Sequence, residues 1–313
     1  MTPLLLIALS IPCVYWTDGA DSRAKLDAAG ISSICVPAGQ ADAWRDTGLT
    51  VTPVTPSELA SREALPAPGV TARAGIASPT RSPWIVANGW RFMRRAGIRY
   101  LSDAPAGKAA LAAAEAFMYG ADVMLKIDPA DLEKLAAMLK FLQTLPAADL
   151  PPVADLGVVD DGSAVTGEAM NLLARRNLLF QVLPSPAAQF RLNIVLGSPA
   201  YPLADAADPS AFALKVRRQL GDEERSVRVY GSEVVICRLT GDAARVRLHL
   251  LNYGGREIEG LHIRLRGAYR DGQLYTSAAG RLPLDDFAVA GGDTEFSVPK
   301  LETYAVIDLQ RAR

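Results

Sequence analysis

Histidine and cysteine are scarce in this sequence. Only two histidines, His249 and His262, occur among 313 residues, which argues against most histidine-based metal sites and proton relays. Three cysteines are too few, and odd in number, for a disulfide framework. The chemistry of the chain must therefore rest on carboxylates, hydroxyls, thiols or Lys and Arg side chains, and no cofactor is expected.

An excess of one charge and a long apolar run are also missing. The 33 basic and 34 acidic side chains leave a net charge of −1, which argues against a nucleic-acid partner. Apolar residues make up 50% of the chain but lie in short runs, whereas a transmembrane segment needs about 20 in a row. At about 150 residues per domain, the length favours two domains.

The N-terminal run MTPLLLIALSIP, residues 1–12, is similar to the hydrophobic region of a secretory signal. No Lys or Arg precedes it and no Ala-x-Ala cleavage site follows it, so the alternative is that it leads into a first buried strand. The compartment therefore stays open between periplasmic or secreted and cytoplasmic. Cys13 and Cys35 are expected on neighbouring strands, where free cysteines behave as small buried hydrophobic residues.

Short apolar runs alternate with amphipathic segments over the first two thirds of the chain. This alternation predicts parallel βαβ units, and eight or nine such strands fit a compact (β/α)8 TIM-like barrel over residues 1–224. An open doubly wound sheet is the alternative. Strands are expected at 13–16, 34–36, 51–54, 70–74, 98–101, 123–127, 156–159, 178–183 and 192–196, and helices at 22–29, 41–47, 83–95, 107–119, 129–144, 168–176 and 210–220.

The pattern changes after about residue 225, where strand-like runs follow one another with Gly, Asp and Asn turns between them. An antiparallel β-sandwich is therefore expected over residues 225–313. The segment RVRLHLLN, residues 245–252, alternates as a half-buried strand does, which predicts that His249 faces outward. The expected strands are 227–230, 234–239, 246–251, 261–265, 296–298 and 304–309.

Acidic side chains follow several of the expected parallel strands, at the ends where active sites of βα folds form. Carboxylates with aromatic neighbours suit glycoside hydrolysis, in which one carboxyl is the acid and another is the base or nucleophile. Asp128 is the candidate nucleophile or base and Asp160 or Asp161 the candidate acid. The alternative is that these aspartates cap the following helices or form Asx turns. The candidate substrate contacts at strand ends are Trp16, Asp18 and Asp103.

The segment Asn88-Gly89-Trp90-Arg91 has an unusual composition. It can form a sugar-binding platform in which Trp90 stacks on the sugar ring and Asn88 or Arg91 bonds the hydroxyls. The alternative is an amphipathic helix in which Trp84 and Trp90 pack on the barrel and the arginines are solvated.

A (β/α)8 barrel with strand-end carboxylates and a small all-β domain resembles a barrel glycoside hydrolase. The run His249-Leu-Leu-Asn252-Tyr253 and residues 301–309 are similar to the end domains of such enzymes. The run Leu125-Lys126-Ile127-Asp128 resembles the Lys-x-Asp that carries the nucleophile in some α-galactosidase-like barrels. The resemblance implies a carbohydrate substrate or ligand.

Two departures from that family pattern keep other functions open. No Asn-Glu pair ends a strand, and the helices and loops are short. A non-catalytic glycan-binding or assembly protein with a degenerate barrel is therefore the alternative. An enzyme that uses the same aspartates to hold Mg²⁺ or Ca²⁺ is a third hypothesis. The sequence is compatible with a monomer or an oligomer.

Overall fold

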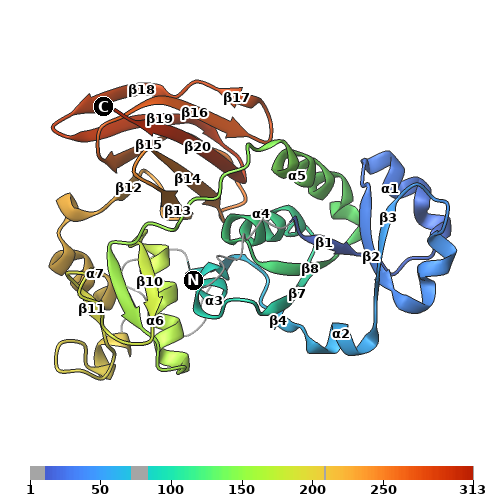
Figure 1. Ribbon diagram of the computed structural model, residues 1–313, viewed down its shortest axis with the longest axis horizontal. Helices are drawn as coiled ribbons and strands as arrows, with labels where there is room; N and C mark the ends of the chain where they lie inside the picture. The colour runs from blue at the N-terminus through green and yellow to red at the C-terminus, as the bar shows by residue number, and fades with distance from the viewer. Residues whose placement is uncertain (1–10, 72–83, 208, 313) are drawn as a thin grey trace, which may run out of the picture. The chain divides into compact units, whose positions relative to one another are not determined.

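A computed structural model describes residues 11–71, 84–207 and 209–312 (Figure 1). The chain forms two compact units, Met1–Gly69 with Arg95–Asp149 and Val70–Arg94 with Leu150–Arg313. The predicted domain boundary at residues 224 and 225 lies inside the second unit and stays a prediction. The apolar run at 1–10 and most of the strand expected at 70–74 lie outside the described residues.

The first unit contains a six-stranded parallel sheet in the order β3-β2-β1-β8-β7-β4. Strands that are consecutive among these six lie side by side, except β3 and β4, which form the two edges, and the first strand, β1, pairs with the last, β8. A doubly wound sheet of the commonest order would place the first strand beside the fourth. The strands are β1 (Cys13–Tyr15), β2 (Ser33–Pro37), β3 (Thr50–Val54), β4 (Glu63–Leu65), β7 (Arg99–Ala104) and β8 (Asp122–Ile127).

The helices of the first unit follow the pattern expected from the sequence. The alanine-rich helix α4 (Ala109–Tyr119) packs on α5 (Leu132–Thr144), and α1 (Arg23–Ala29) also contacts α5. Gly30 and Gly120 end α1 and α4 in the left-handed conformation, with φ of 78° and 64°, which only glycine adopts without strain. Shorter elements are α2 (Pro56–Ser61), η1 (Ala20–Ser22), η2 (Ala38–Trp44) and η3 (Pro129–Asp131).

The second unit begins with an α/β part. Its three parallel strands have the order β10-β9-β11 and pack with two helices in one apolar core. The helix predicted over 83–95 is wrong in its first half, because residues 84–86 form a strand. The elements are β5 (Gly69–Thr71), β6 (Trp84–Val86), α3 (Gly89–Arg94), β9 (Leu156–Val159), α6 (Ala164–Arg175), β10 (Phe180–Leu183), β11 (Asn193–Ile194), η4 (Leu203–Ala207), α7 (Pro209–Leu220) and η5 (Asp222–Glu224).

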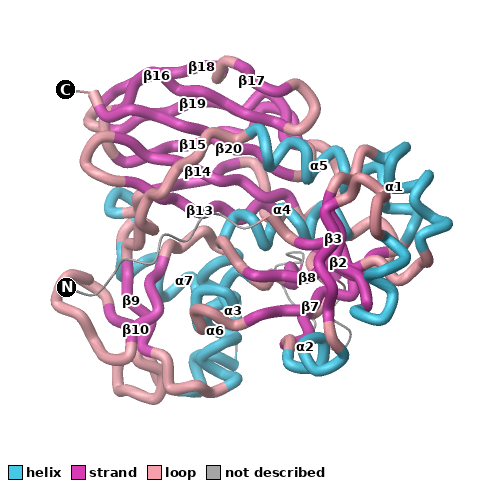
Figure 2. The backbone as a smooth tube through the Cα atoms, turned by 45° about the vertical axis from the view of Figure 1, so that its right-hand side comes forward, coloured by secondary structure: helices cyan, strands magenta, loops and turns pink. Residues whose placement is uncertain are grey.

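Two antiparallel sheets complete the second unit and share one apolar core, as the layers of a β-sandwich do (Figure 2). The predicted change to antiparallel strands is confirmed. One sheet has the order β12-β15-β19-β18, formed by Val227–Tyr230, Ile258–Arg266, Asp293–Leu301 and Asp285–Ala290. The other has the order β13-β14-β20-β16-β17, formed by Val235–Gly241, Arg245–Asn252, Tyr304–Arg311, Tyr269–Thr276 and Gly280–Leu282.

Three expectations need correction. The parallel strands do not form one closed ring of eight within the described residues, because six belong to one sheet and three to another. His249 does not face solvent: it is buried, and its Nδ1 lies 2.7 Å from the Tyr304 hydroxyl. Cys13 and Cys35 are not free, because they form a disulfide, and Cys237 is buried as a free thiol.

Candidate functional site

Asp103 and Asp128 lie at the C-terminal ends of β7 and β8 in the first unit, and both are exposed. Asp103 accepts a hydrogen bond of 2.9 Å from the Lys126 ammonium group. Asp128 accepts one of 2.9 Å from the backbone N–H of Ala130, which makes it the cap of the following 3₁₀ turn. One carboxylate is thus ion-paired and the other caps a helix, which is the alternative role that the sequence left open for Asp128.

Trp16 and Asp18 follow β1 in the same unit. Trp16 is buried, whereas Asp18 is exposed. The Trp16 ring is buried, and its indole N–H donates a hydrogen bond of 2.8 Å to the Ser22 hydroxyl. Trp16 was predicted to contact substrate, and only 3% of its surface is exposed; that contact stays a prediction. Asp18 is exposed in the turn that follows.

Asp160 and Asp161 end β9 in the second unit. Both oxygens of Asp160 accept hydrogen bonds from Arg94, with Nε at 2.8 Å from Oδ2 and a terminal nitrogen at 2.7 Å from Oδ1. This pairing holds the pKa of Asp160 below its usual range. Hydrogen bonds from Ser163 lower the pKa of Asp161 to about 2. Both carboxyls are therefore ionised at neutral pH.

In the Asn88–Arg91 segment of the second unit, the first three residues are buried and Arg91 is partly exposed. Asn88 is buried, and the buried Trp90 ring packs on Gly167 of α6. The Arg91 guanidinium lies 4.1 Å from the centroid of the Trp90 ring. Of the alternative interpretation, the packing of Trp90 is confirmed, although the helix is shorter than expected. A sugar platform formed by Asn88, Trp90 and Arg91 is not supported.

The sequence-predicted residues thus fall into two groups. Asp160 and Asp161 lie in the second unit, where Arg94 joins the end of β9 to the helix that carries Trp90. Asp103, Asp128, Trp16 and Asp18 belong to the first unit. Backbone N–H groups or basic side chains engage the carboxylates of Asp103, Asp128, Asp160 and Asp161.

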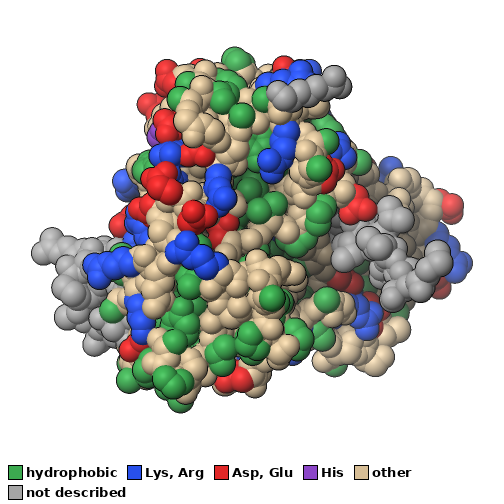
Figure 3. Space-filling view, turned by 60° about the vertical axis from the view of Figure 1, so that its left-hand side comes forward, with side chains coloured by type: hydrophobic (Ala, Val, Ile, Leu, Met, Phe, Trp, Pro, Cys, Tyr) green, Lys and Arg blue, Asp and Glu red, His purple; other side chains and the backbone are tan. Residues whose placement is uncertain are grey.

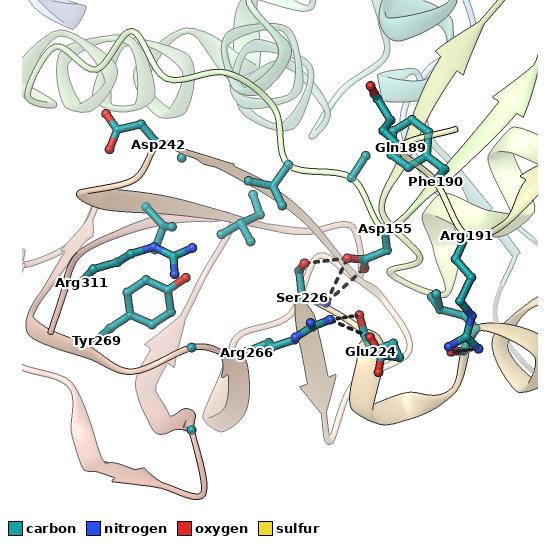
Figure 4. A pocket seen from close by; sticks show the side chains of 18 residues that line it. Asp155, Gln189, Phe190, Arg191, Glu224, Ser226, Asp242, Arg266, Tyr269 and Arg311 are labelled. Atoms are coloured by element: carbon teal, nitrogen blue, oxygen red, sulfur yellow. Dashed lines mark hydrogen bonds and ion pairs between the residues drawn. The ribbon is translucent and has the colours of Figure 1, made fainter. Parts of the chain in front are cut away.

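A cavity of about 640 Å³ in the second unit was not predicted from the sequence (Figure 4). We call it the Asp155 pocket. Its walls come from the segment before β9, the loop before β11, η5 and several ends of the sandwich strands. The side chains that shape it include Asp155, Gln189, Phe190, Arg191, Glu224, Ser226, Asp242, Arg266, Tyr269 and Arg311.

Polar and aromatic groups converge on the Asp155 pocket. Asp155 accepts hydrogen bonds from the Ser226 N–H at 3.1 Å and from the Ser226 hydroxyl at 2.5 Å, and burial raises its pKa. Arg266 donates to Glu224 at 3.0 Å. Arg311 lies 5.5 Å from the centroid of the Tyr269 ring. The pocket therefore combines a carboxyl with a raised pKa, guanidinium groups and an aromatic wall.

Sequence analysis missed this pocket because its residues come from segments up to about 150 positions apart and form no motif. The one local signal was Gln189-Phe190-Arg191, a polar and aromatic loop between two strands. Among the described residues, no group of His, Cys, Asp and Glu side chains could hold a metal ion. None of the helices in the described part of the chain has the length and apolar character needed to cross a membrane.

No protein-family model matches the chain, and a search of curated proteins gave no match. Among solved structures, it is similar to α-L-fucosidase isoenzyme 2 from Paenibacillus thiaminolyticus, with 11% identity and a TM-score of 0.56 over 88% of this chain and 71% of that one. A β-galactosidase from Rahnella sp. R3 gives 9% identity and a TM-score of 0.44 over 71% of this chain and 56% of that one.

A β-galactosidase from Bacillus circulans sp. alkalophilus gives 10% identity and a TM-score of 0.41 over 90% of this chain and 63% of that one. At these identities the likeness concerns the fold alone, and the fucosidase carries it. The expected resemblance to the architecture of glycoside hydrolases is confirmed at that level.

Proposed function

We propose that this protein binds carbohydrate on a glycoside-hydrolase-like fold without cleaving glycosidic bonds at the strand-end aspartates. The observation that carries the proposal is that these carboxylates already accept hydrogen bonds from other groups of the protein. Asp128 caps the 3₁₀ helix that follows β8, and Arg94 donates hydrogen bonds to both oxygens of Asp160. A glycosidase needs one carboxyl that keeps its proton near neutral pH, whereas the pKa values of Asp160 and Asp161 are lowered.

The Asp155 pocket is the ligand site that we propose. Its volume of about 640 Å³ lies within the range of small-molecule sites, roughly 300–1,000 Å³. The Phe190 and Tyr269 rings offer apolar faces, and Gln189 and Arg311 offer hydrogen-bond donors for sugar hydroxyls. The fold supports carbohydrate as the ligand class, since the similar fucosidase acts on a fucoside by its name.

Binding to a panel of immobilised glycans and soluble oligosaccharides, followed by calorimetry on the best ligand, tests the proposal. Gln189→Ala and Arg311→Ala should each weaken binding about tenfold, because each removes hydrogen bonds to the ligand. Arg270→Ala is the matched control, since Arg270 is exposed, pairs with the neighbouring Asp271 and does not line the pocket. Equal affinity in all three variants would place the ligand elsewhere.

A hydrolase is the second candidate. Asp103 and Asp128 are exposed at the ends of the neighbouring strands β7 and β8, where catalytic groups of barrel enzymes lie. In this hypothesis Asp128 is the nucleophile or base and Asp160 or Asp161 the acid, with Asp18 and Asp103 contacting substrate. Hydrolysis of aryl glycosides or polysaccharides that is lost in both Asp128→Asn and Asp160→Asn would establish it and overturn the non-catalytic proposal.

We also propose that the parallel strands of the first unit derive from a (β/α)8 barrel. All six strands are parallel, as in such a barrel, which supports this, and β1 and β8, the first and last strands of this unit, pair. The sheet of this unit is not closed, because its edge strands β3 and β4 do not pair with each other.

The Cys13–Cys35 disulfide supports an oxidising compartment, such as the periplasm or the cell exterior. Disulfides persist there, whereas the cytosol keeps most thiols reduced.

A further inference from the structure

A second cavity in the second unit has five arginines among the eleven residues that line it. It has a volume of about 380 Å³, and we call it the Arg pocket. Its guanidinium groups come from the end of α6, the last turns of α7 and the start of the sandwich. They belong to Arg175, Arg176, Arg217, Arg225 and Arg228.

Nearby carboxylates balance only part of this charge. Asp222 binds Arg217 through two hydrogen bonds of 2.7 and 2.6 Å and also lies 3.3 Å from Arg225. Glu223 bonds Arg228 at 3.2 Å but is shared with Arg264. Glu233 lies 3.7 Å from Arg176, which is too far for a hydrogen bond.

Leaving aside Arg175, which stacks on the Trp84 ring, four guanidinium groups face three carboxylates, one of which is shared with Arg264. Figure 3 shows Lys and Arg side chains (blue) interspersed with Asp and Glu side chains (red) on one face of the molecule, so mixed charge is usual there. At the Arg pocket the balance shifts to positive. A positive cavity of this kind concentrates anions.

Two of these arginines have buried donors without acceptors. The Nε atoms of Arg225 and Arg228 are buried and have no hydrogen-bond partner among the described residues. The two residues are only 6% and 8% exposed. A buried donor on a charged group that lacks an acceptor is costly, so such donors usually meet a ligand or water.

The rim of the cavity adds neutral polar groups. Tyr230, Gly231 and Ser232 form the turn between β12 and β13, and Gly231 has a φ of 83°. Tyr230 is partly exposed there. A hydroxyl donor beside guanidinium forks is a common setting for oxyanions, which accept several hydrogen bonds at once.

We propose that the Arg pocket binds a tetrahedral oxyanion, phosphate or sulfate, either free or as an ester on a larger ligand. Guanidinium forks pair with such groups through two parallel N–H donors, and a dianion offsets the surplus positive charge. The competing explanation is that the arginines only stabilise the C-terminal ends of α6 and α7 through the helix dipoles. That explanation leaves the buried Nε donors of Arg225 and Arg228 without a role.

Calorimetry on the full chain at low salt tests the proposal, with inorganic phosphate and sulfate as probes and chloride as the reference. One saturable site per chain is expected. Arg176→Ala and Arg228→Gln should each weaken binding about tenfold or more, because each removes a charge-assisted contact. Arg218→Ala is the matched control: Arg218 lies next to Arg217 on α7, is exposed and does not line the cavity.

A phosphorylated monosaccharide, compared with the same sugar lacking phosphate, separates the two sources of the oxyanion. Tighter binding of the ester than of inorganic phosphate indicates a ligand that carries the group. Equal binding indicates the free ion. Absence of saturable binding of phosphate, sulfate and the ester, or binding that Arg176→Ala and Arg228→Gln leave unchanged, would overturn the proposal. These variants lie outside the Asp155 pocket, so failure here leaves the carbohydrate proposal untouched.

Discussion

Replacing Asp160 by Asn tests whether the Asp160 carboxylate has a structural or a catalytic role. Asp160 receives two guanidinium nitrogens of Arg94 and the backbone N–H of Gly162 at 3.0 Å. Arg94 also donates to the carbonyl of Ser163 at 2.8 Å. This cluster fixes helix α3 to the loop between β9 and α6. We therefore expect Asp160→Asn to lower the stability of the second unit without removing a catalytic acid.

The magnitude follows from the burial of the pair. The side chains of Arg94 and Asp160 are 12% and 18% exposed, which lies between a surface pair and a buried one. Exposed pairs contribute about 0–1 kcal/mol and breaking a buried pair costs about 3–5 kcal/mol, so a loss of about 2–3 kcal/mol is expected. For a unit of this size, that loss lowers Tm by roughly 4–12 °C.

The pH dependence gives a second readout. The folded protein holds the pKa of Asp160 below its unfolded value, so its contribution to stability is present at neutral pH. It is lost as pH falls below the usual Asp range and through the lowered folded pKa. The difference in Tm between the natural chain and Asp160→Asn should therefore be large at pH 7 and shrink in acid.

Thermal unfolding followed by circular dichroism measures both effects. Asp271→Asn is the control, because Asp271 lies in the same unit, is exposed and pairs at the surface with Arg270. Its Tm should stay closer to that of the natural chain. An unchanged Tm for Asp160→Asn, or a fully stable variant that loses hydrolysis of a glycoside, would refute the structural role of Asp160.

Three further outcomes are expected. The Cys13–Cys35 disulfide joins residues 22 positions apart, and its reduction should destabilise the first unit by about 3 kcal/mol. Denatured but unreduced protein should show one reactive thiol, that of Cys237. Three reactive thiols would contradict the disulfide. Gly167→Ala would place a Cβ 2.7 Å from the Trp90 ring and should cost about 1–3 kcal/mol in urea unfolding; no loss would contradict the packing. Burial lowers the pKa of His249, so NMR should detect no titration between pH 5 and 8, and a midpoint there would contradict it.

Local patterns predicted most of the regular structure. The strand Val227–Tyr230 matches its expected bounds, and the helix Ala109–Tyr119 ends where expected, because apolar periodicity and a C-terminal glycine are local signals. The segment at 83–95 failed because Trp84-Ile85-Val86 is a short strand with β-branched residues, and the helix starts only at Gly89. A short strand inside a helix-like stretch has too few residues to show its own period.

Strands without an apolar face escaped prediction. Every residue of β18 (Asp285–Ala290) is exposed at the edge of its sheet, so no inward-facing alternation marks it. The strand β16 (Tyr269–Thr276) contains Arg270-Asp271-Gly272, which indicates a turn in sequence but forms a bulge in the structure. In both cases the partner strands, and not the segment itself, determine the conformation.

The disulfide and the pockets depend on tertiary contacts. Cys13 and Cys35 were expected on neighbouring strands, but only the register of β1 beside β2 brings them to a Cα separation of 5.9 Å. The walls of the Asp155 pocket come from both the α/β part and the sandwich of the second unit. Sequence spacing alone contains no information on such a convergence.

An aspartate directly after a parallel strand can act in catalysis or cap the next helix, and the sequence pattern is the same for both roles. Asp128-Pro129 is a good helix start, since the carboxylate accepts a backbone N–H and Pro needs none. The same residue position would serve catalysis at the end of a barrel strand. Which role applies depends on the groups that surround the carboxyl, and these come from segments far apart in the sequence, as Arg94 does for Asp160.

Asp155 is the carboxyl whose environment moves its pKa toward neutrality. Burial raises this pKa, and the hydrogen bonds from Ser226 offset only part of the rise. A general acid must keep its proton until the transition state, which Asp155 does better than the ionised Asp160 or Asp161. Any glycoside hydrolysis by this protein should therefore be lost in Asp155→Asn and persist in Asp160→Asn, in proportion to the folded fraction measured by circular dichroism. The reverse pattern would show that the strand end of β9, and not the Asp155 pocket, carries the chemistry.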